Sequence, residues 1–426
     1  MRVIVSPSTA TGSLSAPSSK SSMQRACAAA LLHNGKTFIN NAGNSNDDKA
    51  ALNIIQHLGA KVKFEVDKII IYSKGLSAAD IIENKVISCG ESGLSFRMFA
   101  PIVALSSGTI NLTGSGSLLG RPMIFFDEIF PQLKVHIKSN NGFLPLRITG
   151  PLQPINITID GSVSSQFLTG LLFAFGDAAI EEVTIKVKDL KSGPYIDLTL
   201  DVMRRFGYNI INKNYLQFLI KPKSNIKNIV EYTVEGDWSS ASFLLVAGAV
   251  SGTVKVTGLD ENSAQADKAI LTALKSCGAI INMSENTIEV CKTDLKSFKF
   301  DATNCPDLFP PLAVLAAYCN GTSIIKGTHR LVAKESNRAE TLKEIFGKMG
   351  IEIILLEDEM HIIGGKIKSA IVSSHHDHRI AMAAGVAALG ATGSIEIDNA
   401  EAINKSYPQF YNDLKKLGTD INIIGE

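Results

Sequence analysis

Basic residues that could bind anions recur at two kinds of position along this chain. Some lie at or within two turns of the start of an expected apolar helix: Lys20, Arg25, Arg97 and Arg379. Others lie in loops that follow expected strands: Arg121, Lys334, Arg338 and Lys405. A buried charge is costly unless it is paired, and helix N-termini attract anions because their N–H groups are unpaired. For the group as a whole we therefore favour anion binding over surface salt bridges.

Two short motifs place acids and histidines beside these cations. In KESNR, Lys334 and Arg338 are four residues apart and would share a face if the segment were helical, with Glu335 projecting nearby. HHDHR, residues 375–379, suggests a metal site. However, three adjacent side chains do not easily converge on one ion, and no distant Cys or His has motif spacing. We therefore expect no metal.

Other polar motifs leave two interpretations open. SSQFLTG, from Ser164, offers hydroxyls and an amide that suit a phosphate or an ordinary helix cap. Asp307, in CPD, would by its type most often be a helix N-cap. The glycine-rich run from Thr113 matches neither nucleotide-binding pattern, and no GxSxG or plausible Cys–His pair indicates covalent hydrolysis.

The elements that must position these residues form a repeat. Six segments share a polar cluster followed by about ten apolar and small residues, and they start at Lys20, Glu91, Ser164, Asp237, Asp307 and Asp377. Successive starts are 71, 73, 73, 70 and 70 residues apart. An alternating stretch typical of a half-buried strand follows each segment. Then comes a more polar helix, closed by glycine in five repeats. The second repeat, FFDEIFPQLKV, lacks this glycine, so its helix end stays uncertain.

Six repeats predict an α/β protein of two similar domains with three repeats each. Each repeat should bury its apolar helix and leave its amphipathic helix outside. A length of 426 residues also exceeds one ordinary core. If the buried helices of a domain aim their N-termini at one centre, that centre attracts anions. Ordinary α/β alternation with chance spacing is the alternative.

Composition narrows the class of protein. The formal net charge of +1 does not fit a nucleic-acid binder. The N-terminus does not resemble a signal peptide, and the apolar runs are too short to span a membrane. Six scattered cysteines without a CxxC pair predict reduced, mostly buried thiols: Cys27, Cys89, Cys277, Cys291, Cys305 and Cys319. We therefore expect a cytoplasmic protein.

Eight strings in register resemble one family. SSKSSMQR, LGRPM, SSQFLTG, SGPYID, CPD, KESNR, DHRIAM and NKSYP occur in the order and spacing of the 5-enolpyruvylshikimate-3-phosphate synthases, from about Ser19 to Pro408. The resemblance implies two domains, each of three βαβαββ units with buried helices in an inside-out α/β barrel-like fold. The active site would lie in the cleft between them. We expect one domain to comprise residues 1–18 and 235–426, and the other 19–234.

The resemblance also implies a reaction. The 5-hydroxyl of shikimate 3-phosphate attacks C2 of phosphoenolpyruvate while C3 gains a proton, and phosphate leaves as C3 loses it. This step of the shikimate pathway leads to chorismate and aromatic amino acids, and it requires no metal or organic cofactor. It needs a base near the hydroxyl, an acid/base near C3, and cations for phosphates and carboxylates. The expected partners are these two substrates, without nucleic acid or membrane, and the expected state is a monomer.

Positions that match the family's motifs supply these groups. Asp307 resembles the base, Glu335 the group that moves the C3 proton, and Lys20 the lysine that bridges both substrates. The residues expected to bind shikimate 3-phosphate are Lys20, Ser21, Arg25, Ser164, Ser165, Gln166, Ser192, Tyr195, Asp307 and Lys334. Those expected to bind phosphoenolpyruvate are Lys20, Gly93, Arg97, Arg121, Gln166, Arg338, His378, Arg379 and Lys405. Of these arginines, Arg121, Arg338 and Arg379 suit bidentate contact with the carboxylate of phosphoenolpyruvate.

The chain departs from the family pattern at three places. Ser19 replaces a glycine, ESGL at residues 91–94 replaces NAGT, and Asn337 replaces an acid. The ESGL change adjoins the expected phosphoenolpyruvate pocket, so we hypothesise altered sensitivity to glyphosate. Two alternatives are a UDP-N-acetylglucosamine enolpyruvyl transferase, whose loop cysteine is missing from GSGSLLGRP, and a non-catalytic ligand-binding homologue. An RNA phosphate cyclase would need nucleotide binding, which the sequence does not indicate.

Overall fold

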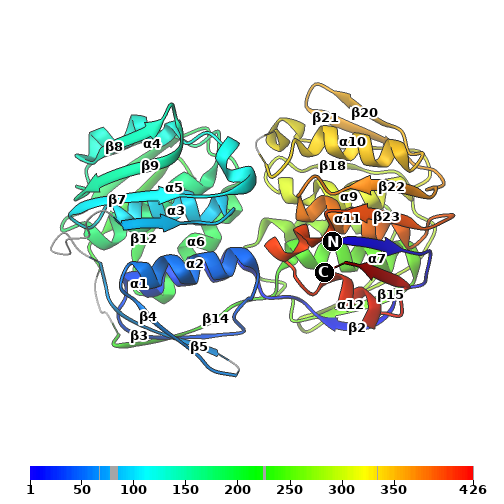
Figure 1. Ribbon diagram of the computed structural model, residues 1–426, viewed down its shortest axis with the longest axis horizontal. Coiled ribbons are helices and arrows are strands. Elements are labelled where there is room, and N and C mark those ends of the chain that lie inside the picture. Colours follow the sequence, from blue (N-terminus) through cyan, green and yellow to red (C-terminus); the bar gives the residue numbers. More distant parts are fainter. Residues whose placement is uncertain (67, 77–84, 224–226, 333, 426) are drawn as a thin grey trace. The chain divides into compact units, whose positions relative to one another are not determined.

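Six four-stranded sheets recur along the part of the chain that the structure describes, residues 1–66, 68–76, 85–223, 227–332 and 334–425 of a computed structural model (Figure 1). The chain divides into two compact units. Unit 1 comprises Met1–Ser19 and Glu235–Glu426, and unit 2 comprises Lys20–Val234. The chain therefore passes between the units twice.

Every sheet has the same strand order. In the second repeat, β6 (Lys85–Ser88) pairs in parallel with β7 (Gly108–Thr113). The antiparallel pair β8 (His136–Asn140) and β9 (Phe143–Gly150) then joins through β9. Helix α3 (Gly93–Val103) links the parallel strands, and α4 (Ile124–Ile129) with η2 (Phe130–Leu133) leads into the hairpin. The order of elements is therefore βαβαββ, which confirms the predicted fold class.

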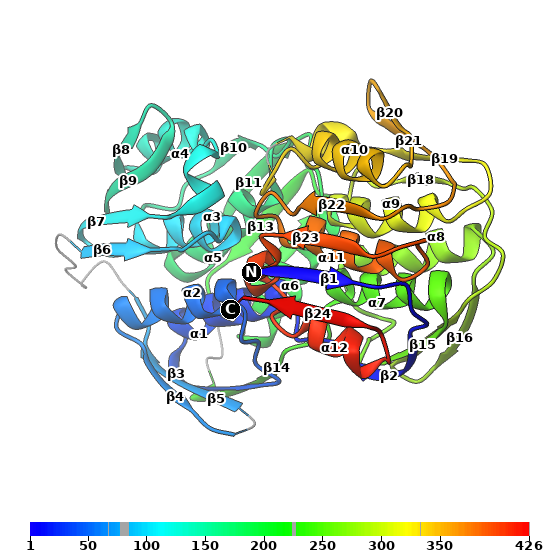
Figure 2. The ribbon, with the colours of Figure 1, turned by 45° about the vertical axis from the view of Figure 1, so that its right-hand side comes forward.

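The other sheets repeat this plan with their own strands. Unit 2 also contains β14 (Ile229–Thr233), β3 (Asn34–Asn40), β5 (Lys68–Lys74) and β4 (Lys61–Phe64), and β10 (Ile157–Asp160), β11 (Val183–Lys188), β13 (Gln217–Lys221) and β12 (Asn209–Lys213). Unit 1 contains β2 (Thr11–Ser15), β15 (Thr253–Thr257), β17 (Thr287–Cys291) and β16 (Ile280–Ser284), and β18 (Lys299–Asp301), β19 (Thr322–Lys326), β21 (Glu359–Ile363) and β20 (Ile353–Leu356). Its third sheet, β22 (Ala370–Ser373), β23 (Ile395–Asp398), β1 (Arg2–Val5) and β24 (Ile421–Ile424), joins both chain ends (Figure 2).

Two edge strands are exchanged where the chain changes unit. Strand β2 precedes the first buried helix in sequence, yet it pairs in parallel with β15 of unit 1. Strand β14 precedes the fourth buried helix, yet it pairs in parallel with β3 of unit 2. Each exchange keeps its sheet at four strands, so both crossings preserve the repeat.

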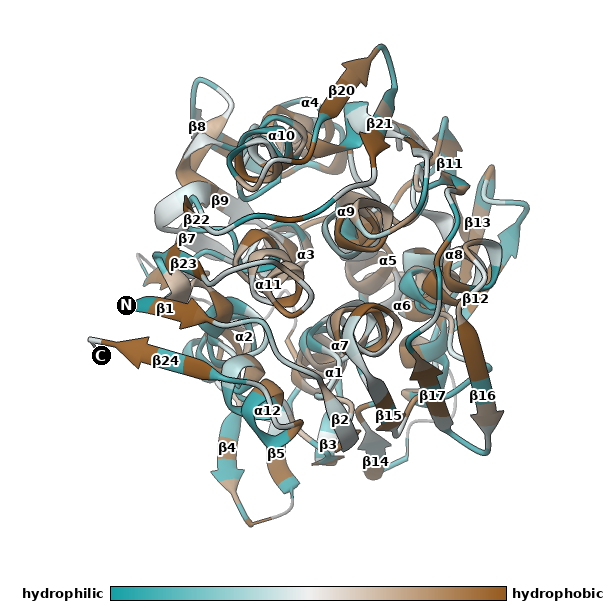
Figure 3. Cartoon of the chain, turned by 90° about the vertical axis from the view of Figure 1, so that its right-hand side faces the viewer, coloured by the Kyte–Doolittle hydropathy of each residue, from teal (hydrophilic) through white to brown (hydrophobic). Residues whose placement is uncertain are grey.

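The apolar helices form the core of each unit. They are α1 (Lys20–Leu32), α3 and α5 (Ser165–Ala178) in unit 2, and α7 (Trp238–Ser251), α9 (Phe309–Ala317) and α11 (His378–Ala388) in unit 1. Nearly all their residues are buried, and the three helices of each unit pack on one another. Figure 3 shows α7, α9 and α11 end-on with strands around them. These helices have no polar face to present to water, so sheets and outer helices pack around them.

The second helix of each repeat is amphipathic and partly exposed. These helices are α2 (Asn46–His57), α4, α6 (Gly193–Arg205), α8 (Ile270–Ser276), α10 (Arg338–Lys348) and α12 (Phe410–Lys416). Short 3₁₀ turns precede several helices: η1 (Gly116–Gly120), η3 (Ala266–Ala269), η4 (Pro306–Leu308), η5 (Thr328–Leu331) and η6 (Ala400–Lys405). The prediction of one buried and one outer helix in each repeat is confirmed.

A left-handed residue follows the outer helix in all six repeats. Five are the predicted glycines, Gly59, Gly207, Gly278, Gly350 and Gly418, with φ between 83° and 104°. In the second repeat Lys134 adopts this conformation, with φ 64° and ψ 20°. The helix end that the sequence left uncertain therefore has the same geometry as the others. Because lysine has a Cβ, the left-handed conformation is more strained there than it is at glycine.

Two further properties follow from the core. All six cysteines are free thiols, and only Cys291 is not fully buried. Among the described residues, no helix combines the length and apolar character needed to cross a membrane.

Candidate active site

Acidic side chains stand at the N-termini of the buried helices of unit 1. Asp377 caps α11 by accepting the backbone N–H of Arg379 at 3.0 Å, and Asp237 caps α7 by accepting that of Ser240 at 2.9 Å. Asp307 lies in η4, directly before α9, but its side chain caps no helix. Helix N-termini favour negative charge, so they stabilise these carboxylates. The candidate residues predicted from the sequence lie at the same helix ends.

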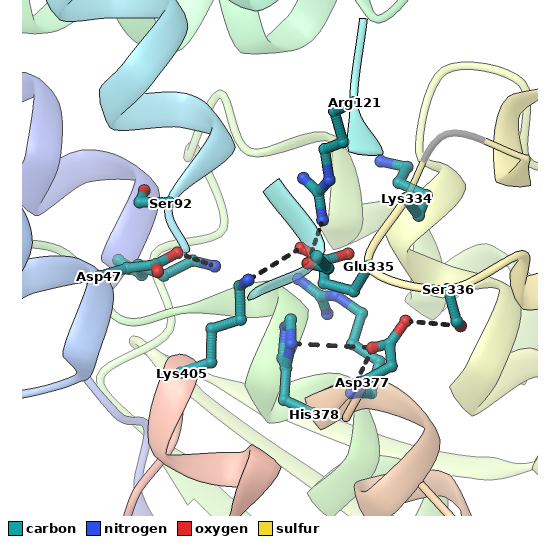
Figure 4. A network of polar contacts seen from close by, with 12 residues as sticks. Asp47, Ser92, Arg121, Lys334, Glu335, Ser336, Asp377, His378 and Lys405 are labelled. Atoms are coloured by element: carbon teal, nitrogen blue, oxygen red, sulfur yellow. Dashed lines mark hydrogen bonds and ion pairs between the residues drawn. The ribbon is translucent and has the colours of Figure 1, made fainter. Parts of the chain in front are cut away.

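Arg338, the first residue of α10, binds two of these acids, Asp377 and Asp307, and also Glu335. Figure 4 shows Glu335 and Asp377 with the neighbouring Ser336 and His378. The Nε of Arg338 donates to Asp377 Oδ2 at 2.7 Å, its Nη1 to Asp307 Oδ1 at 2.7 Å, and its Nη2 to Glu335 Oε2 at 2.6 Å. The side chain is 1% exposed. A planar guanidinium can serve several acceptors at fixed angles, so this one residue fixes the mutual placement of three carboxylates.

The KESNR segment is not helical before Arg338. Residues 334–336 form a bend and the helix begins only at Arg338, so the condition for Lys334 and Arg338 to share a helix face is not met. The bend nevertheless brings both cations to one acceptor, because Lys334 Nζ lies 3.1 Å from Asp307 Oδ1. Asn337 is the N-cap residue of α10, without a side-chain cap bond.

Asp307 is surrounded by positive charge. Besides Lys334 and Arg338, it accepts from Arg379 Nη2 at 3.2 Å. Burial alone would raise the pKa of Asp307, but the charges of Arg379, Lys334 and Arg338 hold it well below its usual value. Burial in turn lowers the pKa of Lys334, against the opposing charge of Asp307. The structure therefore brings the predicted base together with three of the predicted binding residues.

Glu335 and Lys405 approach from different loops. Lys405, at the end of η6, places its Nζ 3.9 Å from Glu335 Oε1, and both side chains are largely buried. His378, 1% exposed, has its Nδ1 3.7 Å from Asp377 Oδ1. Unit 1 thus gathers every site residue predicted from its sequence, and these residues come from the fifth and sixth repeats.

Asp377 is a central residue that the sequence analysis did not assign. It is fully buried and accepts from Arg338, from the backbone of Arg379 and from Ser336 Oγ at 3.1 Å. In the sequence, the HHDHR motif that contains Asp377 was considered only as a possible metal site. The usable signal was its position at the start of the sixth repeat, where an acid caps the buried helix.

In unit 2, the first repeat supplies Lys20, Ser21 and Arg25. Lys20 opens α1, and its Nζ lies 2.9 Å from Asp47 Oδ2. Arg25 is 1% exposed, and its Nη1 donates to the carbonyl of Ser21 at 2.8 Å. Its Nε donates to Thr199 Oγ1 at 2.8 Å, which ties α1 to α6. The local contacts fix Arg25 at the N-terminal part of α1.

The third repeat supplies the hydroxyls and the amide. Ser164 caps α5, since its Oγ accepts from the backbone N–H of Gln166 at 3.3 Å. Gln166 Oε1 accepts from Arg97 Nη1 at 2.9 Å. Ser192, the N-cap residue of α6, has φ 58° and makes no side-chain cap bond, while the carbonyl of Tyr195 accepts from Arg25 at 3.2 Å. The capping interpretation of Ser164 is thus correct, and it leaves the second interpretation open.

Gly93 allows two arginines to approach a helix N-terminus. It is the first residue of α3, after the N-cap Ser92. A Cβ on Gly93 would lie 2.7 Å from Arg121 Nη1 and 3.3 Å from Arg97 Nη1. Two guanidinium groups close to a helix N-terminus form an arrangement that suits an anion.

Glu91 adds a negative charge beside this arrangement. A Cβ on Gly116, whose φ is 54°, would lie 2.3 Å from the Glu91 carboxyl carbon. Glycine at this position therefore makes room for the acid that replaces an expected asparagine. The effect on glyphosate sensitivity stays a prediction.

The histidines of HHDHR have separate partners. His375 Nε2 lies 3.0 Å from Glu344 Oε2, whereas His378 faces Asp377. Across the described ranges, no group of three or more His, Cys, Asp or Glu side chains could hold a metal ion. The arrangement offers cations and acid/base groups.

Comparisons with known proteins agree on one family. A family model described as EPSP synthase (3-phosphoshikimate 1-carboxyvinyltransferase) matches residues 4–414. A 3-phosphoshikimate 1-carboxyvinyltransferase from Clostridium novyi (strain NT) is 36% identical over 422 residues, 97% of this chain and 96% of that protein. One from Clostridium acetobutylicum is 37% identical over 433 residues, 99% and 98% of the two chains.

Solved structures share the fold. An EPSP synthase from Acinetobacter baumannii has a TM-score of 0.82 at 24% identity, covering 99% of each chain. The enolpyruvyl transferase NikO from Streptomyces tendae has a TM-score of 0.76 at 16% identity, covering 99% of this chain and 98% of its own.

Proposed function

The chain belongs to the EPSP synthase (3-phosphoshikimate 1-carboxyvinyltransferase) family, and we propose on this basis that it joins phosphoenolpyruvate to shikimate 3-phosphate. The enolpyruvyl (1-carboxyvinyl) group passes to the 5-hydroxyl, and phosphate is released. The protein thereby serves the shikimate pathway to chorismate and aromatic amino acids.

The arrangement around Arg338 is the observation that supports this proposal best. Two acids with different surroundings, Asp307 and Glu335, share one buried guanidinium. Asp307 also contacts Lys334 and Arg379, whereas Glu335 faces Lys405. Addition–elimination needs two proton-transfer groups and several cations for anionic substrates, and this cluster contains both.

Asp307 would take the proton of the 5-hydroxyl. Three cations keep it ionised, so it is an acceptor before substrate arrives. Substrate phosphate and carboxylate groups would compete for the same cations. As the cations turn toward substrate, Asp307 loses stabilisation of its charge and becomes the stronger base.

Glu335 would move the C3 proton. In the addition step, the hydroxyl oxygen bonds to C2 while C3 accepts a proton from Glu335. In the elimination step, the C2–O bond to phosphate breaks, the leaving phosphate takes the proton that Asp307 holds, and the C3 proton returns to Glu335. Lys405, 3.9 Å from Glu335, supports its ionised form in between.

Unit 2 would supply further anion-binding groups. Arg97 and Arg121 meet at the N-terminus of α3, and both suit a planar carboxylate. The hydroxyls of Ser164, Ser165 and Ser192 suit the phosphate of shikimate 3-phosphate. That the active site lies in a cleft between domains stays a prediction, as do a cytoplasmic location and a monomeric state.

Phosphate release tests the function. Purified protein would be mixed with phosphoenolpyruvate and either shikimate 3-phosphate or UDP-N-acetylglucosamine. We expect release with shikimate 3-phosphate alone, and its loss in Asp307→Ala and Glu335→Ala. Asp301→Asn is a matched control, because this acid of the same unit interacts with Thr303, Lys326 and His329, none of which is a candidate site residue.

Each other outcome would change the assignment. Tight binding of shikimate 3-phosphate without phosphate release would indicate a non-catalytic homologue. Release only with the nucleotide sugar would indicate the sister transferase. Full activity of both alanine variants would overturn the roles of Asp307 and Glu335.

A further inference from the structure

Asp47 holds the amine of Lys20 in a nearly buried ion pair. Lys20 Nζ lies 2.9 Å from Asp47 Oδ2, and the two side chains are 14% and 5% exposed. Lys20 opens α1, Asp47 lies in the first turn of α2, and these two helices pack on one another. An ion pair removed from solvent is screened little by salt. The attraction between the two charges therefore holds the Lys20 ammonium close to Asp47.

Asp47 is not needed to begin its helix. The N-terminus of α2 is capped by Ser45 and Asp48, which exchange side-chain and backbone hydrogen bonds in a capping box. Within the described residues, the Asp47 carboxylate has Lys20 as its ion-pair partner and caps nothing. A buried carboxylate without a capping role is costly, which favours a role exerted through the lysine.

The repeat places Asp47 where other repeats place candidate site residues. Counted from the start of the buried helix, Asp47 follows Lys20 by 27 residues. The matching loop residues follow their helix starts by 28 residues: Ser192 after Ser164, Glu335 after Asp307, and Lys405 after Asp377. Asp47 lies in the first turn of the second helix of its repeat, whereas the other three residues lie shortly before that helix. If Asp47 were only structural, the first repeat would have no site residue near this position.

We propose that Asp47 is a positioning residue that fixes the ammonium of Lys20 for catalysis. The inference rests on the proposed function, in which Lys20 bridges both substrates. A lysine side chain has four rotatable bonds, and a buried acceptor at 2.9 Å restricts the conformations that it can adopt. Removing that acceptor leaves the positive charge in place but releases its position, and misplacement by about 1 Å can reduce a rate about 10²-fold.

A double-mutant cycle tests the proposal. Asp47→Asn would be made alone and together with Lys20→Met, and kcat, both KM values and the affinity for shikimate 3-phosphate by calorimetry would be measured. We expect Asp47→Asn alone to lower kcat/KM or this affinity about 10- to 100-fold. In the Lys20→Met background it should change the affinity less than about twofold, because the group it positions is gone.

Two further variants keep the test decisive. Asp47→Glu retains the charge and should recover most of the loss, which also serves if Asp47→Asn does not fold. Asp48→Asn, the adjacent acid, should alter thermal stability but leave kcat/KM within about threefold.

The outcomes separate the two proposals. Wild-type protein without phosphate release from shikimate 3-phosphate would refute the proposed function. An active wild type with an unchanged Asp47→Asn would refute the role of Asp47. Equal losses from Asp47→Asn with and without Lys20 would also refute it, because they would show an action independent of the lysine.

Discussion

Replacing Arg338 with lysine keeps the positive charge but removes the planar fork that joins three acids. The guanidinium makes four hydrogen bonds, two to Asp377 and one each to Asp307 and Glu335. The lysine side chain is shorter, and its ammonium group can donate to only some of these carboxylate oxygens. Hydrogen bonds to charged groups contribute about 1.5–3 kcal/mol each, so the loss of two costs about 3–6 kcal/mol.

The fully buried Asp377 makes the loss severe. Removing one partner from a buried ion pair outright typically costs about 3–5 kcal/mol, and Arg338→Lys approaches this limit because the shorter ammonium side chain no longer holds Asp377 through two hydrogen bonds. We expect the free energy of unfolding of unit 1 to fall by about that amount, with a midpoint lower by about 6–20 °C. If Arg338 also binds phosphoenolpyruvate, kcat/KM for this substrate should fall at least about 10²-fold.

Thermal unfolding and phosphate-release kinetics would measure both effects. Arg2→Lys is the matched control, because Arg2 also joins two acids, Glu396 and Asp398, but is 51% exposed. Exposed ion pairs contribute little, so this variant should resemble the wild type. Activity of Arg338→Lys within fivefold of wild type, at unchanged stability, would refute the reasoning from the buried fork.

Three other predictions follow. Burial raises the pKa of Asp48 from 3.8 to about 6, so the native state loses stability as the pH rises from 4 to 6. Above pH 6, the Asp48→Asn variant should therefore be up to about 3 kcal/mol more stable to unfolding than the wild type, and below pH 4 the two should be equally stable. A pH series of urea unfolding with no difference at pH 7 would contradict this. Gly93→Ala would place Cβ 2.7 Å from Arg121 Nη1, and KM for phosphoenolpyruvate should rise about tenfold without unfolding; an unchanged KM would count against a site there. Lys134→Gly should stabilise unit 2 by up to about 1 kcal/mol because φ is 64°, and a lower urea midpoint would refute that.

Much of the fold could be predicted because each repeat has a local pattern of apolar and polar residues that identifies its helices and strands. Helices without a polar face must be buried, and a 70–73-residue period fixes how many there are. The helix end at Lys134 could not be predicted, because a lysine in the left-handed conformation carries no sequence signal. Local patterns did not give the partners of β2 and β14 either: only the family resemblance assigned their segments to domains, and only the structure pairs β2 with β15 and β14 with β3.

The candidate site shows the same division. Residue types and the match to family motifs selected Lys20, Asp307, Glu335 and Arg338 as candidates from the sequence alone. The ion pairs of Asp377 and Asp47 were decided only by the tertiary structure, because each joins side chains 27 to 39 residues apart through the packing of different helices. A sequence specifies which groups can ionise and which helices must be buried. Which charges meet depends on where those helices begin in space, and that is fixed only once the core has packed.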